Sequence, residues 1–293
     1  MIPFRLSRTA FILAPLLAAG CAAMSTPQQQ RPEKVFAVTG ADKLVSFNAG
    51  SPGNVRSWAR ISGLADGETV ASIDFRPANG KLYAVTTAGR LYTIDTASGA
   101  ATRVGTTDTS PFMKSKDVAL NFNPTVDRIR LVGAAGENMR LHPDTGAVVD
   151  ANPNQDGVQL DGALAYAGGD MHAGRKPVVT GTAYTNSVPG AKGTTNFGID
   201  SSLGVLVTQG TREGTPMPVS PNTGQLYTVG SLGVKTVGPV AFDIAPATNA
   251  AFASIVSANG KQALYEIDLR SGAATMIGVI GSGEPVRAMA VAP

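Results

Sequence analysis

The chain has 293 residues, of which 43% are hydrophobic and only 15% are charged, with 24 basic and 21 acidic side chains. Removal of an N-terminal segment that contains Arg5 and Arg8 leaves 22 basic and 21 acidic groups, a net charge of +1. This balance, without a run of basic residues, excludes an electrostatic basis for nucleic-acid binding. The 34 glycines suit many short strands joined by tight turns.

Residues 1–20 have the pattern of an export signal. Two arginines precede an apolar run, residues 9–20, that is shorter than the about 20 apolar residues a membrane-spanning helix needs. The small residues before Cys21, the single cysteine of the chain, resemble the lipobox of bacterial lipoproteins. This resemblance implies cleavage before Cys21 and lipidation of its thiol, with Ala22 favouring the outer membrane. An ordinary secretory signal, which leaves a soluble protein, is the alternative.

The rest of the chain divides into a tether and a domain. Residues 21–33 are polar and rich in proline and glutamine, without apolar periodicity, which predicts a flexible tether. Residues 34–293 are enough for one large all-β domain. If Cys21 carries a lipid, this domain has no thiol for a disulfide, so packing alone must stabilise it.

A segment of short alternating strands recurs along the domain. The first copy spans residues 70–105, and later copies begin near residues 118 and 240. Asn-Gly, Ala-Gly and Ser-Gly pairs supply the positive φ that tight hairpin turns need. Periods of about 45 residues are typical of the four-stranded blades of a β-propeller. Equivalent positions in the first strands are spaced by 47, 44, 78 and 47 residues, at Asp74, Asn121, Ala165, Asp243 and Ala290.

The two ends of the domain are predicted to supply strands to the same blade. Residues 287–293 form a first strand with nothing after it, and residues 35–39 and 43–47 provide strands that this blade lacks. We therefore predict an all-β propeller whose ring is closed by pairing of the N- and C-terminal strands. The interval of 78 residues predicts one enlarged blade with an extra hairpin, and so five blades. Two compact blades in that interval, which would make six, are the alternative.

Four stretches carry a family resemblance: residues 183–187, 194–200, 226–234 and 242–244. They are similar to an uncharacterised bacterial family, a domain of unknown function, whose members are exported and propeller-like. The resemblance covers residues 34–293 and implies the fold and the export, but it assigns no activity.

The histidines do not indicate a catalytic or metal site. His142 and His172 are expected in a turn and a loop, without a Cys, His or Glu partner at metal-ligand spacing. A zinc site and a Ser-His-Asp triad are therefore not predicted. The acidic stretch at residues 150–157 imitates part of a calcium loop but lacks the distal glutamate of an EF-hand.

Three polar side chains share one repeated position: Asp74, Asn121 and Asp243. Equivalent positions of a propeller converge at its axis, where these oxygens can hold Ca²⁺, which accepts several carboxylate and carbonyl ligands. The arrangement is similar to that of some propeller lactonases and related hydrolases. The other interpretation is that Asp and Asn cap the turn before a proline through the backbone.

Loops supply the predicted binding surface. Long glycine-rich loops at residues 168–176 and 186–194, with a polar segment at residues 113–117, form it if they share one rim. We expect a lipid-anchored envelope module that binds a protein or glycan partner without catalysis or cofactor. A Ca²⁺-dependent hydrolase or lactonase with an axial metal is the alternative. The candidate contact residues are Lys114, Lys116, His172 and Asn186.

Overall fold

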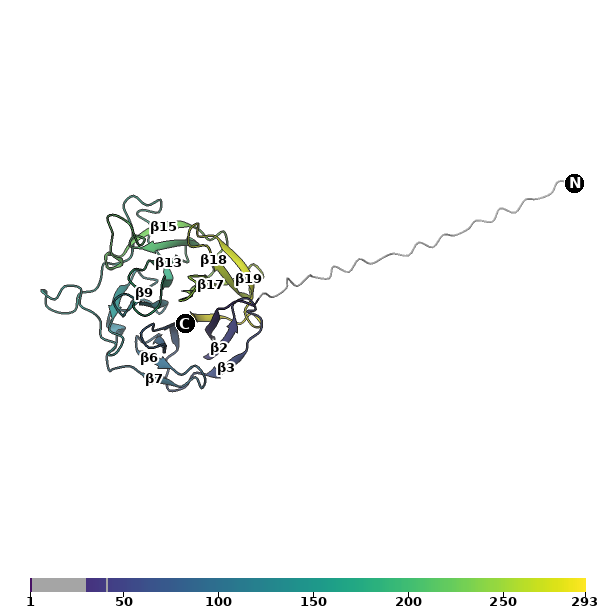
Figure 1. Ribbon diagram of the computed structural model, residues 1–293, viewed down its shortest axis with the longest axis horizontal. Coiled ribbons are helices and arrows are strands. Elements are labelled where there is room, and N and C mark those ends of the chain that lie inside the picture. Colours follow the sequence, from purple (N-terminus) through teal and green to yellow (C-terminus); the bar gives the residue numbers. More distant parts are fainter. Residues whose placement is uncertain (2–29, 41) are drawn as a thin grey trace.

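The computed structural model describes residue 1, residues 30–40 and residues 42–293. In this part of the chain, five β-sheets surround a common axis (Figure 1), which confirms the predicted five-bladed propeller. The predicted export signal, Cys21 and most of the predicted tether lie outside the described residues. No helix in the part described has the length and apolar character needed to cross a membrane.

Each blade is a mainly antiparallel sheet, numbered here in chain order with the innermost strand first. Blade 1 consists of β20 (Val286–Val291), β1 (Lys34–Thr39), β2 (Lys43–Asn48) and β3 (Ser57–Arg60). Blade 2 consists of β4 (Val70–Phe75), β5 (Leu82–Thr86), β6 (Leu91–Ile94) and β7 (Ala101–Arg103). Blade 3 consists of β8 (Val118–Asn123), β9 (Arg128–Gly133) and β10 (Asn138–Leu141).

Blades 4 and 5 complete the ring. Blade 4 consists of β12 (Val179–Tyr184), β13 (Asn196–Asp200), β14 (Val205–Gln209), β15 (Gln225–Ser231) and β11 (Ala165–Tyr166). Blade 5 consists of β16 (Ala241–Ile244), β17 (Ala251–Val256), β18 (Gln262–Ile267) and β19 (Ala274–Val279). Two short 3₁₀ helices lie in connections: η1 (Ser110–Phe112) and η2 (Pro221–Thr223).

Blade 1 combines strands from both ends of the domain. β1 pairs antiparallel with β20, with Val35 opposite Val291 and Ala37 opposite Met289. The innermost strand of this blade thus comes from the C-terminus and the next three strands come from the N-terminal part. The predicted closure of the ring by the two terminal strands is confirmed.

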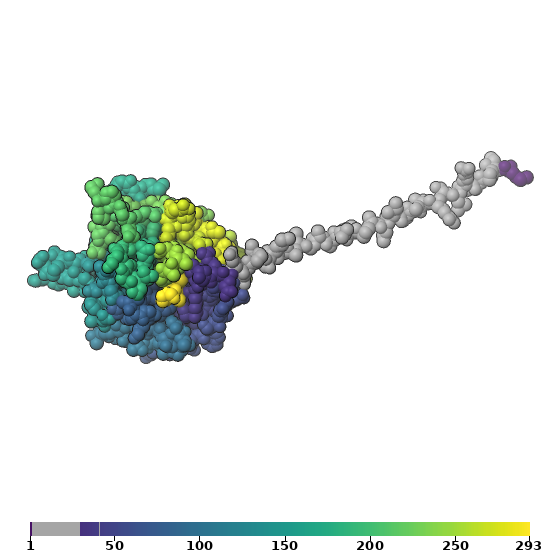
Figure 2. Space-filling model, viewed as in Figure 1, coloured from purple at the N-terminus to yellow at the C-terminus, as the bar shows by residue number. Residues whose placement is uncertain are grey.

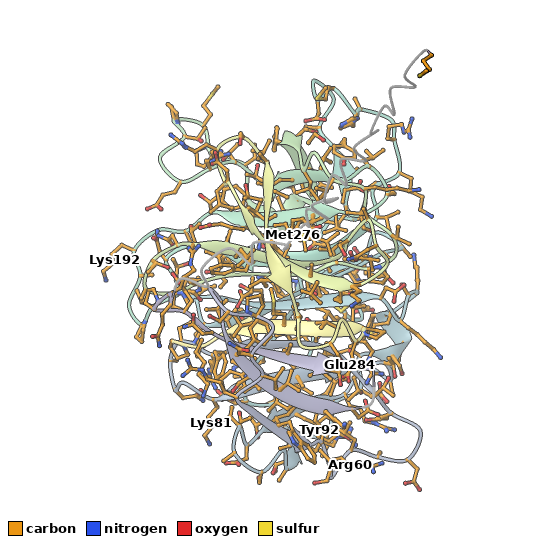
Figure 3. The ribbon with its side chains drawn as sticks, turned by 90° about the vertical axis from the view of Figure 1, so that its right-hand side faces the viewer. Arg60, Lys81, Tyr92, Lys192, Met276 and Glu284 are labelled. Atoms are coloured by element: carbon orange, nitrogen blue, oxygen red, sulfur yellow. The ribbon has the colours of Figure 1, made fainter. Side chains whose placement is uncertain are left out.

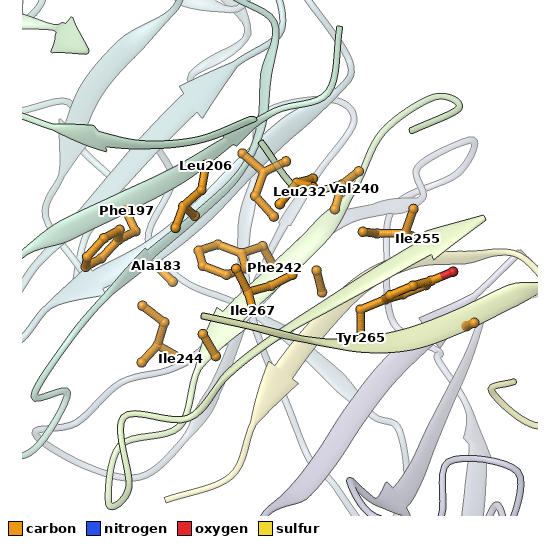
Figure 4. Packing of buried hydrophobic residues seen from close by; sticks show 14 residues of the cluster. Ala183, Phe197, Leu206, Leu232, Val240, Phe242, Ile244, Ile255, Tyr265 and Ile267 are labelled. Carbon is orange, nitrogen blue, oxygen red and sulfur yellow. The ribbon is translucent and has the colours of Figure 1, made fainter. Parts of the chain in front are cut away.

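The hydrophobic core lies between neighbouring blades. The innermost strands contact one another in the cyclic order β4, β8, β12, β16 and β20. Between blades 4 and 5, Phe197 and Phe242 belong to one buried cluster (Figure 4). Between blades 2 and 3, the rings of Tyr83 and Phe122 meet edge to face, 5.1 Å apart. Side chains alternate between the two faces of a strand, so each blade packs against both of its neighbours.

The innermost strand of the enlarged blade differs from the prediction. The repeat alignment assigns Ala165 to that strand, and this is wrong: β11, which contains Ala165, is a two-residue outer strand that pairs parallel with β15. β12 is innermost, so Ala183 takes the repeated position. The enlarged blade gains one outer strand and not an extra hairpin.

β12 fits the innermost place because its residues are buried and one of them is very small. All six residues of β12 are buried. A Cβ atom added to Gly181 would lie 2.7 Å from the Cβ of Phe242 on β16, so only glycine permits this approach of the two blades. In the three-stranded blade 3, a bridge between Leu141 and Val148 stands in for the fourth strand.

The ring has two faces, which we name by the direction of the innermost strands. The start face holds the loops that precede these strands, and the end face holds the loops that follow them. In Figure 3, Lys81 and Lys192, in loops that follow β4 and β12, lie on one side, and Glu284, which precedes β20, lies toward the other. The connection between β10 and β11 projects from the ring as a teal extension (Figure 2), and its residues 151–158 are exposed.

Candidate functional site

The predicted axial side chains come together. Asp74 lies on β4, Asn121 on β8 and Asp243 on β16, and all three are buried. The Nδ2 of Asn121 donates a hydrogen bond of 3.1 Å to Oδ1 of Asp243. Burial, and after it the charge of Asp243, raises the pKa of Asp74. This axial cluster therefore couples innermost strands from three blades.

Each member of the axial cluster also binds the backbone of the next innermost strand around the ring. These bonds satisfy buried N–H groups that would otherwise have no partner at the axis. These hydrogen bonds, which we call axial clasps, join neighbouring blades at three of the five blade boundaries. The pairs are Asp74 Oδ2 with Phe122 N (2.7 Å), Asn121 Oδ1 with Tyr184 N (2.9 Å) and Asp243 Oδ2 with Val291 N (2.7 Å).

Burial changes the acidity of both axial carboxyls. It raises the pKa of Asp243 to about 7, although hydrogen bonds from Val291, Ile244 and Asn121 oppose the change. Burial, and then the charge of Asp243, raise the pKa of Asp74 well above its usual range. Two buried acids this close ionise as a coupled pair, so the axis retains a proton near neutral pH.

The axial cluster meets the ligand requirements of a calcium ion only in part. Ca²⁺ takes about 6–8 oxygen ligands, whereas all four carboxylate oxygens of Asp74 and Asp243 already accept backbone N–H groups. Within the described ranges, no group of three or more His, Cys, Asp or Glu side chains is placed to hold a metal ion. Metal binding by Asp74, Asn121 and Asp243 stays a prediction.

The predicted binding loops lie at opposite ends of β12. Lys114 and Lys116 precede β8 and His172 precedes β12, so these three residues belong to the start face. Asn186 follows β12 and belongs to the end face, where its backbone N–H donates to Oδ1 of Asn249 at 2.8 Å. The structure therefore does not bring the two long loops to one rim.

The start face opens into a cavity of about 300 Å³ at the axis, which we call the axial funnel. All five blades contribute to its wall, and the wall is mainly apolar with a few polar groups, as is usual for ligand pockets. Its apolar residues are Val70, Ala71, Val118, Val237, Pro239, Val256, Pro285 and Val286, and its polar residues are Thr87, Lys116, Asp117, Thr180, Gln262 and Arg287.

Arg287 is the funnel residue with an unused donor. Its guanidinium forms an ion pair with Asp42 and donates to the backbone oxygen of Thr39 at 3.3 Å. Its Nε–H is buried and has no hydrogen-bond partner in the described structure. Sequence reasoning finds Lys116 here but misses Arg287, because ring closure is what brings the start of β20 beside the start of β4 and so into the wall of the funnel.

The fold and its axis define a class of protein: a closed five-bladed β-propeller with a buried acidic cluster and an open funnel. The chain belongs to the family described as Domain of unknown function (DUF4394), whose model matches residues 43–290. A search of curated proteins returned no match.

Several solved structures are similar in fold. A Bacteroides uniformis protein provisionally named as a 6-phosphogluconolactonase is 14% identical over 84% of this chain and 82% of its own, with a TM-score of 0.43. The glutaminyl cyclase of Myxococcus xanthus is 13% identical over 74% of this chain and 79% of its own (TM-score 0.45). TolB from Acinetobacter baumannii is 13% identical over 89% of this chain and 67% of its own (TM-score 0.45). Similarity at this level carries no argument about activity.

Proposed function

We propose that this protein is a lipid-anchored binding module of the bacterial envelope and that its ligand site is the axial funnel. The observation that carries the proposal is the mainly apolar cavity to which all five blades contribute, with Arg287, whose buried Nε–H has no partner among the described residues, in its wall. A buried donor without a partner costs about 1–3 kcal/mol, and a small shift of the Arg287 side chain onto an acceptor of a ligand would remove that cost. The ligand that fits has an apolar body and a hydrogen-bond-accepting end.

The path of the chain supports this use of the start face. β1 begins at the end face, because it runs antiparallel to β20. Just before β1, Oε1 of Glu33 accepts a hydrogen bond of 2.7 Å from Thr248, which lies in the end-face loop between β16 and β17. A tether to the membrane through Cys21 therefore leaves from the end face, and the funnel opens on the opposite face.

Photo-crosslinking in cells tests the proposed ligand site. Val237 lines the funnel and the residue is 57% exposed, so benzoylphenylalanine in its place will reach a bound ligand without disturbing the core. We expect a discrete light-dependent adduct, which weakens when Arg287→Gln is added. The matched control carries the same probe in place of Lys81 on the end face. Equal adducts at both positions, or none at Val237, contradict the proposal.

A second candidate function is Ca²⁺-dependent hydrolase or lactonase chemistry at the axis. One observation favours it, namely that Asp74, Asn121 and Asp243 meet there from separate blades. A metal would have to replace their backbone N–H partners. Melting curves with Ca²⁺ and with EDTA test this candidate. A rise of several degrees with Ca²⁺ that Asp243→Ala abolishes supports it, and identical curves contradict it.

A further inference from the structure

The end face contains a second cavity, of about 400 Å³, between blades 3 and 4. Three arginines from blade 3 line it, and η2 and the end of β12 form the opposite wall. We call it the arginine pocket. Its lining residues are Asn123, Val126, Arg128, Arg130, Arg140, Val149, Tyr184, Ser220, Pro221 and Asn222.

Arg130, on β9, is the most buried of these arginines, with a side chain that is 2% exposed. Its Nε donates to the Tyr184 hydroxyl at 3.3 Å, and one Nη atom donates to Oδ1 of Asn222 at 2.5 Å. Burial lowers the pKa of Arg130, but Tyr184 and Asp161 raise it by more, so the pKa lies above its ordinary value. The guanidinium is therefore a fixed, permanent cation in the wall of the pocket.

Asp161 holds two of the arginines in place. Its carboxylate, 1% exposed, accepts hydrogen bonds from Arg130 at 2.6 Å and from Arg140 at 2.8 Å. A buried charge must be paired to be tolerated, and Asp161 supplies the pairing for both guanidinium groups. The two cations are consequently pre-positioned beside each other before any ligand binds, which reduces the cost of binding.

The charges of the pocket do not cancel. Arg128, Arg130 and Arg140 contribute three positive charges, and Asp161 contributes one negative charge, which leaves a net charge of +2. Each guanidinium carries five N–H donors. Hydrogen bonds among the described residues use four donors of Arg130 and two of Arg140. Arg128 donates through one Nη atom, to the backbone oxygens of Val126 and Asp127, so donors remain for a ligand on both Arg128 and Arg140.

The wall opposite the arginines is also fixed. η2 begins at Pro221, and the hydroxyl of Ser220 accepts the N–H of Asn222 at 3.2 Å. Another Nη atom of Arg130 donates to Oδ1 of Asn138, which in turn binds the backbone of Pro221 through its Nδ2 at 3.3 Å. The pocket is thus formed by ordered elements on both sides.

We infer that the arginine pocket binds a small dianionic ligand, a phosphate monoester or a dicarboxylate. The net charge of +2 matches two negative charges, and guanidinium groups suit oxyanions because they donate paired, charge-assisted hydrogen bonds. The volume lies in the range of small-molecule sites. This site is on the face opposite the axial funnel, so the inference does not depend on the proposed function.

Isothermal titration calorimetry of the purified full-length chain tests the inference. Inorganic phosphate and succinate are the two dianion probes, and acetate is the monoanion control. We expect one of the dianions to bind with a stoichiometry of one, more tightly than acetate, and less tightly as salt is added. Which dianion binds better decides between phosphate and dicarboxylate ligands.

Two variants and a control locate the binding. We expect Arg140→Gln and Arg128→Gln each to weaken binding of the preferred dianion by about tenfold or more. Arg270→Gln is the matched control, because the side chain of Arg270 is 91% exposed and lies on blade 5, and it should leave the affinity unchanged. Absence of dianion binding, or equal losses in all three variants, overturns the inference.

Discussion

Asp243 connects three strands that are distant in the sequence. Its carboxylate accepts N–H groups from its own strand β16 and from β20, and it accepts the side-chain amide of Asn121 on β8. The apolar contacts between neighbouring blades have no direction. Directed bonds to a buried carboxylate therefore specify how neighbouring blades align.

The raised pKa of the axial acids predicts that stability falls as pH rises. In the unfolded chain an aspartate ionises near pH 3.9, whereas Asp243 in the folded protein has a pKa of about 7. Between these values only the folded state retains the proton, so its advantage is lost as pH increases toward 7. Asp74 acts in the same direction. Urea unfolding should show a lower free energy of unfolding at pH 8 than at pH 5.

Variants distinguish the pH dependence of stability that the axial acids cause from any contribution of surface acids. The pKa values of Asp95, Asp144 and Glu266 are lowered, so these groups are already ionised above pH 5 and do not contribute to the slope there. We expect Asp243→Asn to flatten the dependence between pH 5 and pH 8 and Asp95→Asn to leave it unchanged. A wild-type protein that becomes more stable over this range would contradict the assignment.

The sequence identifies residues whose role repeats and misses those whose role depends on tertiary contacts. Asp74, Asn121 and Asp243 are found because one strand position recurs in each blade. Arg287 and Asp161 have no such signal. Their importance comes from a ring closure and from a pocket between two blades, neither of which is a local property of the sequence.

At the scale of elements, the innermost strand of each blade faces other strands on both sides. Period-two alternation predicts a strand but does not say whether it is innermost or outermost. Residues around Ala165 and residues of β12 both alternate, and the sequence alignment selects the former. Gly181 is what fits β12 to this place, since its lack of a side chain lets β12 approach Phe242 and the backbone of Val240 in the next blade.

Gly181→Ala should therefore destabilise the protein. The added Cβ would lie 2.7 Å from the Cβ of Phe242 and 3.0 Å from the carbonyl oxygen of Val240, so β12 and β16 must move apart. Overpacking of this kind costs about 1–3 kcal/mol. Urea unfolding measures the loss.

Gly168→Ala is the matched control, because a Cβ at Gly168 meets nothing within 4 Å. We expect this variant to unfold at the wild-type urea concentration. If Gly181→Ala is equally harmless, β12 does not lie against β16 as the structure has it.

At the scale of the whole molecule, the ring separates the start of β1 from the funnel. The N-terminal strand begins at the end face, so the start of β1, the arginine pocket and the loop with Asn186 share that face. The funnel, Lys116 and His172 lie on the other face. The sequence predicts the number of blades and the closure, because both follow from repeat spacing. It does not predict the faces, because they depend on which strand of the enlarged blade is innermost.

The proposed orientation of the funnel away from a membrane requires that the chain is lipidated at Cys21. Cleavage and lipidation at a single thiol would attach acyl chains, and two or more chains anchor a protein stably whereas one binds only marginally. Without the thiol no lipid can be attached. The propeller should still fold, because its hydrophobic core and axial clasps do not involve Cys21. Cys21→Ser should therefore shift the protein from the membrane fraction to the soluble fraction without lowering its melting temperature.

Ser25→Ala is the control for this experiment, because it changes the same segment without removing the thiol. We expect it to remain with the membranes. Fractionation of cells and metabolic labelling with a palmitate analogue provide two readouts, and both should be lost only in Cys21→Ser. A wild-type protein that is soluble and unlabelled would mean that the signal is an ordinary secretory one, and the funnel would then act in a freely diffusing module.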